Sequence, residues 1–292
     1  MLEVAIVGAG MNGLAAAMAL RFAGISACLL DKASRGSEGP WLTTARMEFL
    51  RSPKQVSGLA MDLPALTFRA WSEAQHGTPA WETLDKISRL DWAAYVDWYG
   101  RVLKLDIRSE HAVKQIDLSS NNVVELLVEH RGQSQKVLAR RVIFALGLAA
   151  FGEPAIPDFI SGFPRALKTE DTVQGRWSHS SDPVDCSLLR GRTIVVVGAS
   201  ASAMDCAATA LESGAERVDI LVRRHDFPRI NYAKGAGQPG FEHGYASMPD
   251  EWKLGLLQHF SQVGFPPPRN SVLRVSRYPR SACADFSVAV FL

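Results

Sequence analysis

A glycine-rich turn near the start of the chain constrains the fold more than any other feature. The run Leu2–Val7 is almost continuously apolar, which is typical of a parallel strand buried on both faces. The turn GAGMNG at 8–13 follows it, and the Ala-, Leu- and Met-rich segment 14–23 then favours a helix. A second apolar run, Ile25–Leu30, ends at Asp31. This order predicts a strand, a turn, a helix and a strand of an α/β sheet.

The three glycines of this turn meet three requirements of a bound diphosphate. Gly8 permits the sharp strand-to-helix turn, Gly10 lets the backbone approach a pyrophosphate, and Gly13 allows close packing of the helix on the strand. The helix N-terminus adds unpaired N–H groups and the positive end of the helix dipole. Asp31 is placed to accept hydrogen bonds from ribose hydroxyls. The pattern predicts a dinucleotide site; the alternative is a glycine-rich turn in an unrelated α/β protein. Further candidate contacts are Met11, Asn12 and Lys32.

A similar pattern returns in the second half of the chain, where a strand, a helix and another strand are predicted within 192–222. In the turn between the first two elements, Gly198 is kept, whereas Ser200 and Ala203 replace the second and third glycines. The hydroxyl of Ser200 can bond a phosphate, and Ala203 is expected to hold the helix slightly farther from the strand. Ser202 is a further candidate contact.

The second unit carries arginines where the first carries an acid. Arg223 and Arg224 follow directly after its second strand. Arginine there accommodates a 2′-phosphate, whereas Asp31 suits an unphosphorylated ribose. Because one carrier can hold a flavin while another delivers hydride, we expect FAD in the first unit and NADPH in the second. The alternative is that both arginines only end a strand in solvent.

The rest of the chain links and extends these units. Residues 32–89 are predicted to form loops and short helices, and Ser88 with Asp91 fits a capping box before an amphipathic helix at about 90–105. Three strands separated by turn residues then predict an antiparallel meander. Its strands are His111–Leu118, Val123–His130 and Gln135–Ala145.

These patterns together predict an α/β fold with two Rossmann-like dinucleotide-binding units, the first of which contains the antiparallel meander. The expected boundaries are 1–150 for an FAD-binding domain, 151–191 for a proline-rich crossing segment and 192–292 for an NADP-binding domain.

The composition excludes several other classes of protein. The 32 basic and 30 acidic residues give a net charge of +2, which provides no electrostatic footprint for nucleic acid. The longest apolar run, about Val142–Phe151, is too short to span a bilayer, and Met1 leads directly into a strand instead of a signal peptide. The 4 cysteines form no CxxC pair and have no histidine cluster beside them. We therefore expect a cytoplasmic protein without a metal site, structural disulfides or a membrane partner.

Several stretches, in this order, carry a resemblance to a known family. They are GAGMNG at 8–13, Gly39-Pro40-Trp41, Phe144–Gly147, the sequence WSHS at 177–180 and GASASA at 198–203 with the arginine pair that follows. Over about 1–235 the chain resembles the two-dinucleotide flavoprotein monooxygenases, which include flavin-containing, Baeyer–Villiger and N-hydroxylating enzymes. The stretches MEFLRSPK and RINYAK are similar to a bacterial branch with aspartate N-hydroxylase-like and urate hydroxylase-like enzymes.

The resemblance implies an FAD-dependent, NADPH-consuming monooxygenase. Such an enzyme inserts one oxygen from O₂ into a small molecule, by N-hydroxylation or a related oxygenation, through a flavin C4a-(hydro)peroxide. Trp41 would border the isoalloxazine, with core packing as its alternative, and Gly147 would lie where the chain passes the flavin. The resemblance names no catalytic residue. The weak candidates are His179, Lys54 and Asn231, each with the alternative of a structural or solvated residue. Lys54, Asn231 and Lys234 are also candidates for contact with substrate or NADP.

The resemblance fades near Tyr278, although members of the family continue well beyond the corresponding point. We therefore expect an incomplete NADP domain, with an apolar strand-like segment at 286–292 that needs a partner. One alternative is a nucleotide-binding protein without turnover, or one completed by another chain or a second copy. Another is a flavoprotein disulfide reductase, which needs two neighbouring cysteines beside the flavin. The cysteines at 28, 186, 206 and 283 do not suggest such a pair.

Overall fold

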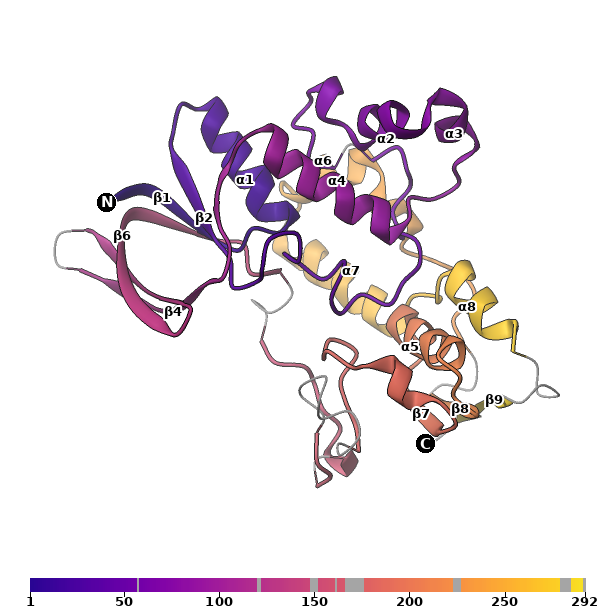
Figure 1. The fold of residues 1–292 in the computed structure, drawn as a ribbon. Helices are drawn as coiled ribbons and strands as arrows, with labels where there is room; N and C mark the ends of the chain where they lie inside the picture. Colours follow the sequence, from indigo (N-terminus) through magenta and orange to yellow (C-terminus); the bar gives the residue numbers. More distant parts are fainter. Residues whose placement is uncertain are drawn as a thin grey trace. The chain divides into compact units, whose positions relative to one another are not determined.

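The computed structural model describes residues 1–56, 58–119, 122–147, 152–160, 162–165, 176–222 and 227–278, and the backbone of 285–290 (Figure 1). The chain divides into two compact units, unit 1 at 1–161 and unit 2 at 162–292. Among the residues that the structure describes, no helix is both long and apolar enough to cross a membrane.

Unit 1 contains a six-stranded sheet. Its strands are β1 (Leu2–Val7), β2 (Ala27–Leu30), β3 (Asp106–Arg108), β4 (His111–Leu118), β5 (Val124–His130) and β6 (Gln133–Phe144). Their order across the sheet is β3-β2-β1-β6-β5-β4. The pairs β2–β3, β1–β2 and β1–β6 are parallel, whereas β4–β5 and β5–β6 are antiparallel. The long strand β6 therefore belongs both to the parallel sheet and to the predicted meander.

Alternate side chains of β1 pack into two different hydrophobic cores, because successive side chains of a strand point to opposite faces of the sheet. Val4 and Ile6 are buried in a core that the helices complete. Ala5 and Val7 are buried in a second core, together with Leu126 and other residues of the meander. Burial on both faces explains why this strand is apolar throughout and does not alternate with polar residues.

The helices of unit 1 are α1 (Met11–Phe22), α2 (Phe68–His76), α3 (Thr78–Thr83) and α4 (Arg89–Val102), with a 3-10 turn at Pro64–Leu66. The hydroxyl of Ser88 accepts a hydrogen bond from the Asp91 N–H at 3.0 Å, which confirms the predicted N-terminal cap of α4. The hydroxyl of Thr67 caps α2 in the same way, with the Ala70 N–H at 3.1 Å.

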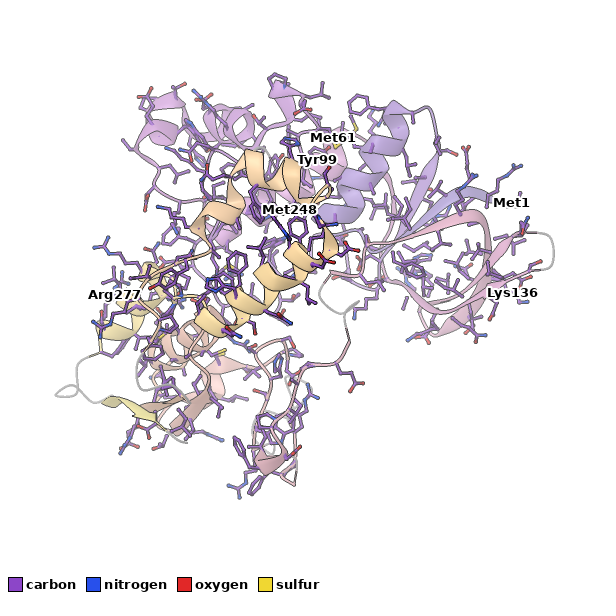
Figure 2. All side chains as sticks on the ribbon, turned by 180° about the vertical axis from the view of Figure 1, so that it is seen from behind. Met1, Met61, Tyr99, Lys136, Met248 and Arg277 are labelled. Carbon is purple, nitrogen blue, oxygen red and sulfur yellow. The ribbon has the colours of Figure 1, made fainter. Side chains whose placement is uncertain are left out.

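An aromatic cluster joins α2 and α3, which lie in the segment predicted as loops and short helices, to α4, which was predicted as an amphipathic helix. Its ring centroids lie 5.2–6.3 Å apart, in tilted and edge-on arrangements. Its members are Phe68, Trp71, Trp81, Trp92, Tyr95 and Tyr99. Figure 2 labels Tyr99, which is fully buried on α4. Trp71 and Trp81 therefore pack the short helices α2 and α3 against the core of unit 1.

Unit 2 repeats the strand–turn–helix–strand pattern. Its strands are β7 (Thr193–Val197), β8 (Arg217–Val222) and β9 (Asp285–Val290), and its helices are α5 (Ala201–Glu212), α6 (Pro239–Tyr245), α7 (Asp250–Val263) and α8 (Arg269–Ser276). Strand order is β7-β8-β9, with both pairs parallel. In both units the first three parallel strands thus lie side by side in chain order. This confirms the predicted α/β class.

The apolar segment near the end of the chain has a partner within unit 2. The backbone of β9 pairs along its whole length with β8. The sequence predicted a strand at 286–292 that required something to pair with it, and β8 supplies the parallel neighbour.

Ion pairs connect α8 to α5. Arg274 donates to both carboxylate oxygens of Glu212 at 2.6 and 2.8 Å and lies 3.3 Å from Asp205. The hydroxyl of Ser271 donates to Asp205 at 2.6 Å. Asp205 and Arg274 are both buried, so their mutual attraction offsets the free-energy cost of removing each charge from water.

Candidate functional site

The first glycine turn has the geometry that the sequence predicts. Gly8 has a φ of +105°, and a Cβ on it would lie 2.4 Å from the carbonyl oxygen of Ala145. A Cβ on Gly13 would lie 2.0 Å from the carbonyl oxygen of Gly8. Both positions therefore exclude side chains. A Cβ on Gly10 would have only the backbone of Gly39 near it, 3.9 Å away, so this face of the turn is free for a ligand.

The N-terminus of α1 lacks the side-chain cap that α2 and α4 have. Its N-cap residue is Gly10, no side chain accepts a hydrogen bond from its first turn, and that turn contains no acidic residue. In α2 and α4, by contrast, hydroxyl groups cap the first turn. Uncapped N–H groups and the positive end of the helix dipole make the start of α1 suited to a phosphate.

Asp31 connects this turn to the end of β2. Its carboxylate accepts hydrogen bonds from the Ala9 N–H at 2.7 Å and from the Ala33 N–H at 2.8 Å. Each oxygen keeps further acceptor capacity, so ribose hydroxyls can still bond to it. Lys32 is exposed beside it. The structure therefore brings Asp31 to the glycine turn, as predicted, although its role toward a ligand stays a prediction.

A small pocket, partly open to solvent, lies between the glycine turn, residues 35–41 and α4. The side chain of Trp41 lines it and meets the ring of Trp92 edge-on, with centroids 6.2 Å apart. Trp41 also packs against the helical core, as its alternative interpretation states, while its place beside an isoalloxazine stays a prediction. Other lining residues are Ala9, Leu14, Arg35, Glu38, Val96 and Gly100.

Glu38 is a pocket residue that no motif singled out. Its carboxylate accepts a hydrogen bond from the Gly36 N–H at 2.7 Å and lies 3.4 Å from the hydroxyl of Ser109. Burial, with a smaller effect from the neighbouring Asp31, raises the pKa of Glu38 above its ordinary value. The only signal in the sequence is its place directly before Gly39-Pro40-Trp41.

The end of β6 also reaches the glycine turn. The Ala145 N–H donates to the carbonyl of Val7 at 2.8 Å, and the Ala145 carbonyl lies against Gly8. Gly147 follows with a φ of +65°, in the left-handed region that favours glycine. The end of β6 therefore lies beside the first turn, while the passage of the chain at Gly147 past a flavin stays a prediction.

The second turn is wider than the first. Gly198 has a φ of +135°, and a Cβ on it would lie 3.5 Å from the Cβ of Ala203, an ordinary contact. This spacing tolerates the alanine, whereas the first turn has no room for a Cβ at Gly13. The helix α5 begins after Ser200, whose hydroxyl accepts no hydrogen bond from the first turn. The N–H groups in the first turn of α5, which includes Ser202, therefore have no side-chain cap. Arg223 and Arg224 lie outside the described residues.

The weak catalytic candidates have local partners. The amine of Lys54 donates to the carbonyl of Trp81 at 2.7 Å. The same amine lies over the ring of Trp81, in the C-terminal half of α3. The His179 N–H donates to Asp182 at 2.6 Å, and its Nδ1 lies 2.7 Å from the hydroxyl of Ser181. Asn231 accepts a hydrogen bond from the Ala233 N–H at 3.1 Å in an exposed turn. Lys234 is exposed. The structure does not bring these residues together around one pocket in unit 1 or unit 2.

Cysteines and metal ligands form no cluster among the residues that the structure describes. Cys28, Cys186 and Cys206 carry free thiols, and no group of three or more potential metal ligands was found there. Burial, followed by the nearby carboxylate of Asp106, raises the pKa of Cys28 to about 12. Its thiol therefore stays protonated at neutral pH, which makes it a poor nucleophile. Cys283 lies outside the described residues.

Each unit contains a βαβ motif whose helix begins at a glycine turn, an arrangement typical of dinucleotide-binding folds. Residues 2–236 match the pyridine nucleotide-disulphide oxidoreductase family, and the chain belongs to this family.

Individual proteins are similar to the chain over almost its whole length. An FAD-dependent urate hydroxylase of Xanthomonas campestris pv. campestris is 35% identical over 291 residues, which are 99% of this chain and 58% of that relative. The chain thus spans little more than half of the relative's length. An ornithine hydroxylase of Pseudomonas aeruginosa has a similar structure, with a TM-score of 0.75, 15% identity and coverage of 98% of this chain and 73% of the other.

A second solved structure is the ornithine N-hydroxylase of Kutzneria sp. 744, which was determined with reduced FAD, NADP⁺ and L-ornithine. Its TM-score is 0.69 at 16% identity, with coverage of 99% of this chain and 71% of the other. At such low identities the two structures show a shared fold.

Proposed function

We propose that the first glycine turn binds FAD and the second binds NADP(H). The observation that carries this proposal is that α1 and α5 each follow a parallel strand through a glycine turn and begin without a side-chain cap. The FAD-dependent relative and the FAD- and NADP⁺-bound structural neighbour support the same pair of ligands. The expected FAD-binding domain at 1–150 and NADP-binding domain at 192–292 are part of this proposal.

The residues of the first turn fit a dinucleotide by shape and by charge. The N–H groups of α1 would bind the diphosphate, and the exclusion of side chains at Gly8 and Gly13 keeps the helix close to it. Asp31 would accept hydrogen bonds from the ribose, and Trp41 would cover the pocket and exclude water.

For the reaction, we propose an NADPH-dependent monooxygenase that oxygenates a small molecule. When bound, FAD supplies the oxygen-activating redox chemistry, which protein side chains lack. The relative that is a urate hydroxylase favours a nitrogen-containing substrate. Because this chain spans 58% of that relative, the activity, O₂ use and substrate all belong to the proposal.

Titration of the purified protein with FAD tests the binding step. The protein should acquire the visible absorbance bands of flavin, and these bands should stay with the protein on gel filtration. A screen of urate, amino acids, amines, ketones and sulfides for stimulated NADPH oxidation would then identify the substrate class. Flavin binding without turnover of any substrate would favour the alternative of a non-catalytic nucleotide-binding protein. Failure to retain FAD would contradict the proposal itself.

Arg223→Ala tests which nicotinamide cofactor is used. Loss of a guanidinium that pairs with the 2′-phosphate should raise the KM for NADPH about tenfold or more and leave the KM for NADH nearly unchanged. Steady-state kinetics with both cofactors measure the ratio. Equal effects on NADPH and NADH would contradict selection of the 2′-phosphate by this residue.

A disulfide reductase is the second candidate, because its class shares the family and the paired dinucleotide units. Thiol–disulfide exchange needs a thiolate beside the flavin. Cys28 of unit 1 is buried, and its raised pKa keeps it protonated. Cys28 therefore does not suit such an exchange, which favours the monooxygenase.

A further inference from the structure

The loop that carries Trp41 is joined to the start of α4 by main-chain hydrogen bonds. We define the Trp41 loop as residues 39–50. The Leu50 N–H donates to the carbonyl of Ile87 at 2.8 Å, and the Arg89 N–H donates to the carbonyl of Glu48 at 2.9 Å. These bonds fix the end of the loop. They do not reach the part near Trp41, which borders the pocket.

The side chain of Arg89 connects this part of the loop to α4, in addition to the edge-on contact between Trp41 and Trp92. Its Nε donates to the carbonyl of Met47 at 3.0 Å, and its Nη1 donates to the carbonyl of Trp41. One half-buried guanidinium therefore bridges two carbonyls that are six residues apart in the loop. Arginine can do this because its donors form a rigid planar fork, which the single ammonium of lysine does not offer.

The position of Arg89 in α4 is not explained by the stability of the helix. It is the first residue after the N-cap Ser88, at the positive end of the helix dipole. A cation there is unfavourable, because cations stabilise the C-terminal end of a helix. The contacts with the loop are therefore the reason that the structure offers for an arginine at this position.

The loop in turn lies against the glycine turn. The Cα of Gly39 is the nearest atom to a Cβ built on Gly10, and the ring of Trp41 lines the same pocket as Ala9. The helix α4 is a firm support, because Tyr95 and Tyr99 are fully buried. Arg89 thus connects a rigid helix to the backbone that faces the diphosphate turn.

We propose that Arg89 is a positioning residue for the flavin dinucleotide, which sets the distance between Trp41 and the first glycine turn. This inference rests on the proposed binding of FAD at that turn. Arg89 acts through the Trp41 loop and does not itself contact the cofactor.

The test compares Arg89→Met, Arg89→Lys and Trp41→Ala with the double variant Arg89→Met/Trp41→Ala, in the full-length protein. We expect Arg89→Met to raise the dissociation constant for FAD about tenfold and Arg89→Lys to raise it less, because lysine keeps the charge without bridging both carbonyls. In the Trp41→Ala background, Arg89→Met should have little further effect, because the residue that it positions is absent.

The matched control is Arg69→Met, which removes an arginine of α2 that pairs on the surface with Glu73. Its dissociation constant for FAD should equal that of the parent protein. Lower thermal stability with an unchanged dissociation constant in both Arg89 variants, or additive effects of Arg89→Met and Trp41→Ala, would show a purely structural role and overturn the inference. Should Arg89→Met not fold, Arg89→Lys decides the question alone. Failure of the parent protein to bind FAD would overturn the proposed function, and this inference with it.

Discussion

At the scale of single residues, two glycines of the first turn have separable tasks. Gly13 is required by packing, because a Cβ there would lie 2.0 Å from the carbonyl oxygen of Gly8. Gly10 has no such neighbour, and its φ of −67° is accessible to alanine. The room at Gly10 is therefore useful only when a ligand approaches it.

This difference predicts distinct outcomes for two alanine substitutions. Gly13→Ala should destabilise the protein by about 3 kcal/mol, because backbone atoms must move to admit the Cβ. Gly10→Ala should leave thermal unfolding of the ligand-free protein nearly unchanged and weaken FAD binding. Thermal denaturation and FAD titration of both variants measure the two effects. A large loss of stability in Gly10→Ala would show that its role is structural.

Glu38 gives a pH-dependent prediction. Burial raises its pKa above the ordinary value of 4.5, so the folded state disfavours the ionised form. Stability from this group is therefore highest below pH 4.5 and falls as pH rises through the higher folded-state pKa. Glu38→Gln should raise the Tm at pH 7, and this gain should disappear in acid. Exposed Glu48→Gln is the control, which should show no such gain. A Tm that falls at pH 7 in Glu38→Gln would contradict the assignment.

At the scale of elements, the starts of the helices differ in what satisfies their N–H groups. Side chains satisfy them in α2 and α4, whereas α1 and α5 begin at uncapped glycine turns. Such ends cost stability unless water or a ligand provides acceptors. The helices proposed to bind phosphate also differ from α3, which begins at Gly77 without a side-chain cap, because α1 and α5 each follow directly after a parallel strand.

Substitutions of Ser88 and Ser200 test this difference between helix starts, because both residues occupy N-cap positions. Ser88→Ala should cost about 1 kcal/mol of stability, since the hydroxyl that accepts from Asp91 is lost. Ser200→Ala should leave the stability of the ligand-free protein unchanged and raise the dissociation constant for NADP⁺. Urea denaturation and NADP⁺ titration decide between these roles, and equal stability losses in the two variants would contradict the distinction.

At the scale of the whole molecule, the chain consists of two units with separate cores. Unit 2 is held by the buried charges between α5 and α8, which have no equivalent motif in the sequence of unit 1. Removing one member of such a pair leaves an uncompensated buried charge, which is strongly destabilising.

Arg274→Met should therefore cost unit 2 about 3–5 kcal/mol, since the buried Asp205 loses its cation. Hydrogen exchange measured by mass spectrometry should show faster exchange in α5 and α8 and little change in β1 or α1. The matched control is Arg217→Met, which removes a surface arginine of β8 that pairs with Asp219. Equal loss of protection in unit 1 would show that the two units unfold together.

Both phosphate turns could be predicted from local sequence, because their requirements concern adjacent residues. Glycines between an apolar strand and a helix specify the turn, and Asp31 follows at the end of the next strand. The meander and the N-cap of α4 were predictable for the same reason: turn and capping residues act over a few positions. The fold class followed from the order of these elements.

Other features depended on contacts between distant residues. The sequence did not indicate that Arg89 would bridge the carbonyls of Trp41 and Met47, or that Glu38 would line the pocket. The same holds for the pairing of β9 with β8. These contacts join segments separated by long stretches of chain, so no local pattern encodes them.

The sequence alone determined the two nucleotide-binding units, because steric limits on glycine and the apolar character of buried strands act within each unit. Only the tertiary structure decided how the first turn is enclosed. That enclosure depends on α4 and the Trp41 loop, which meet through packing and hydrogen bonds between residues that are far apart in the chain.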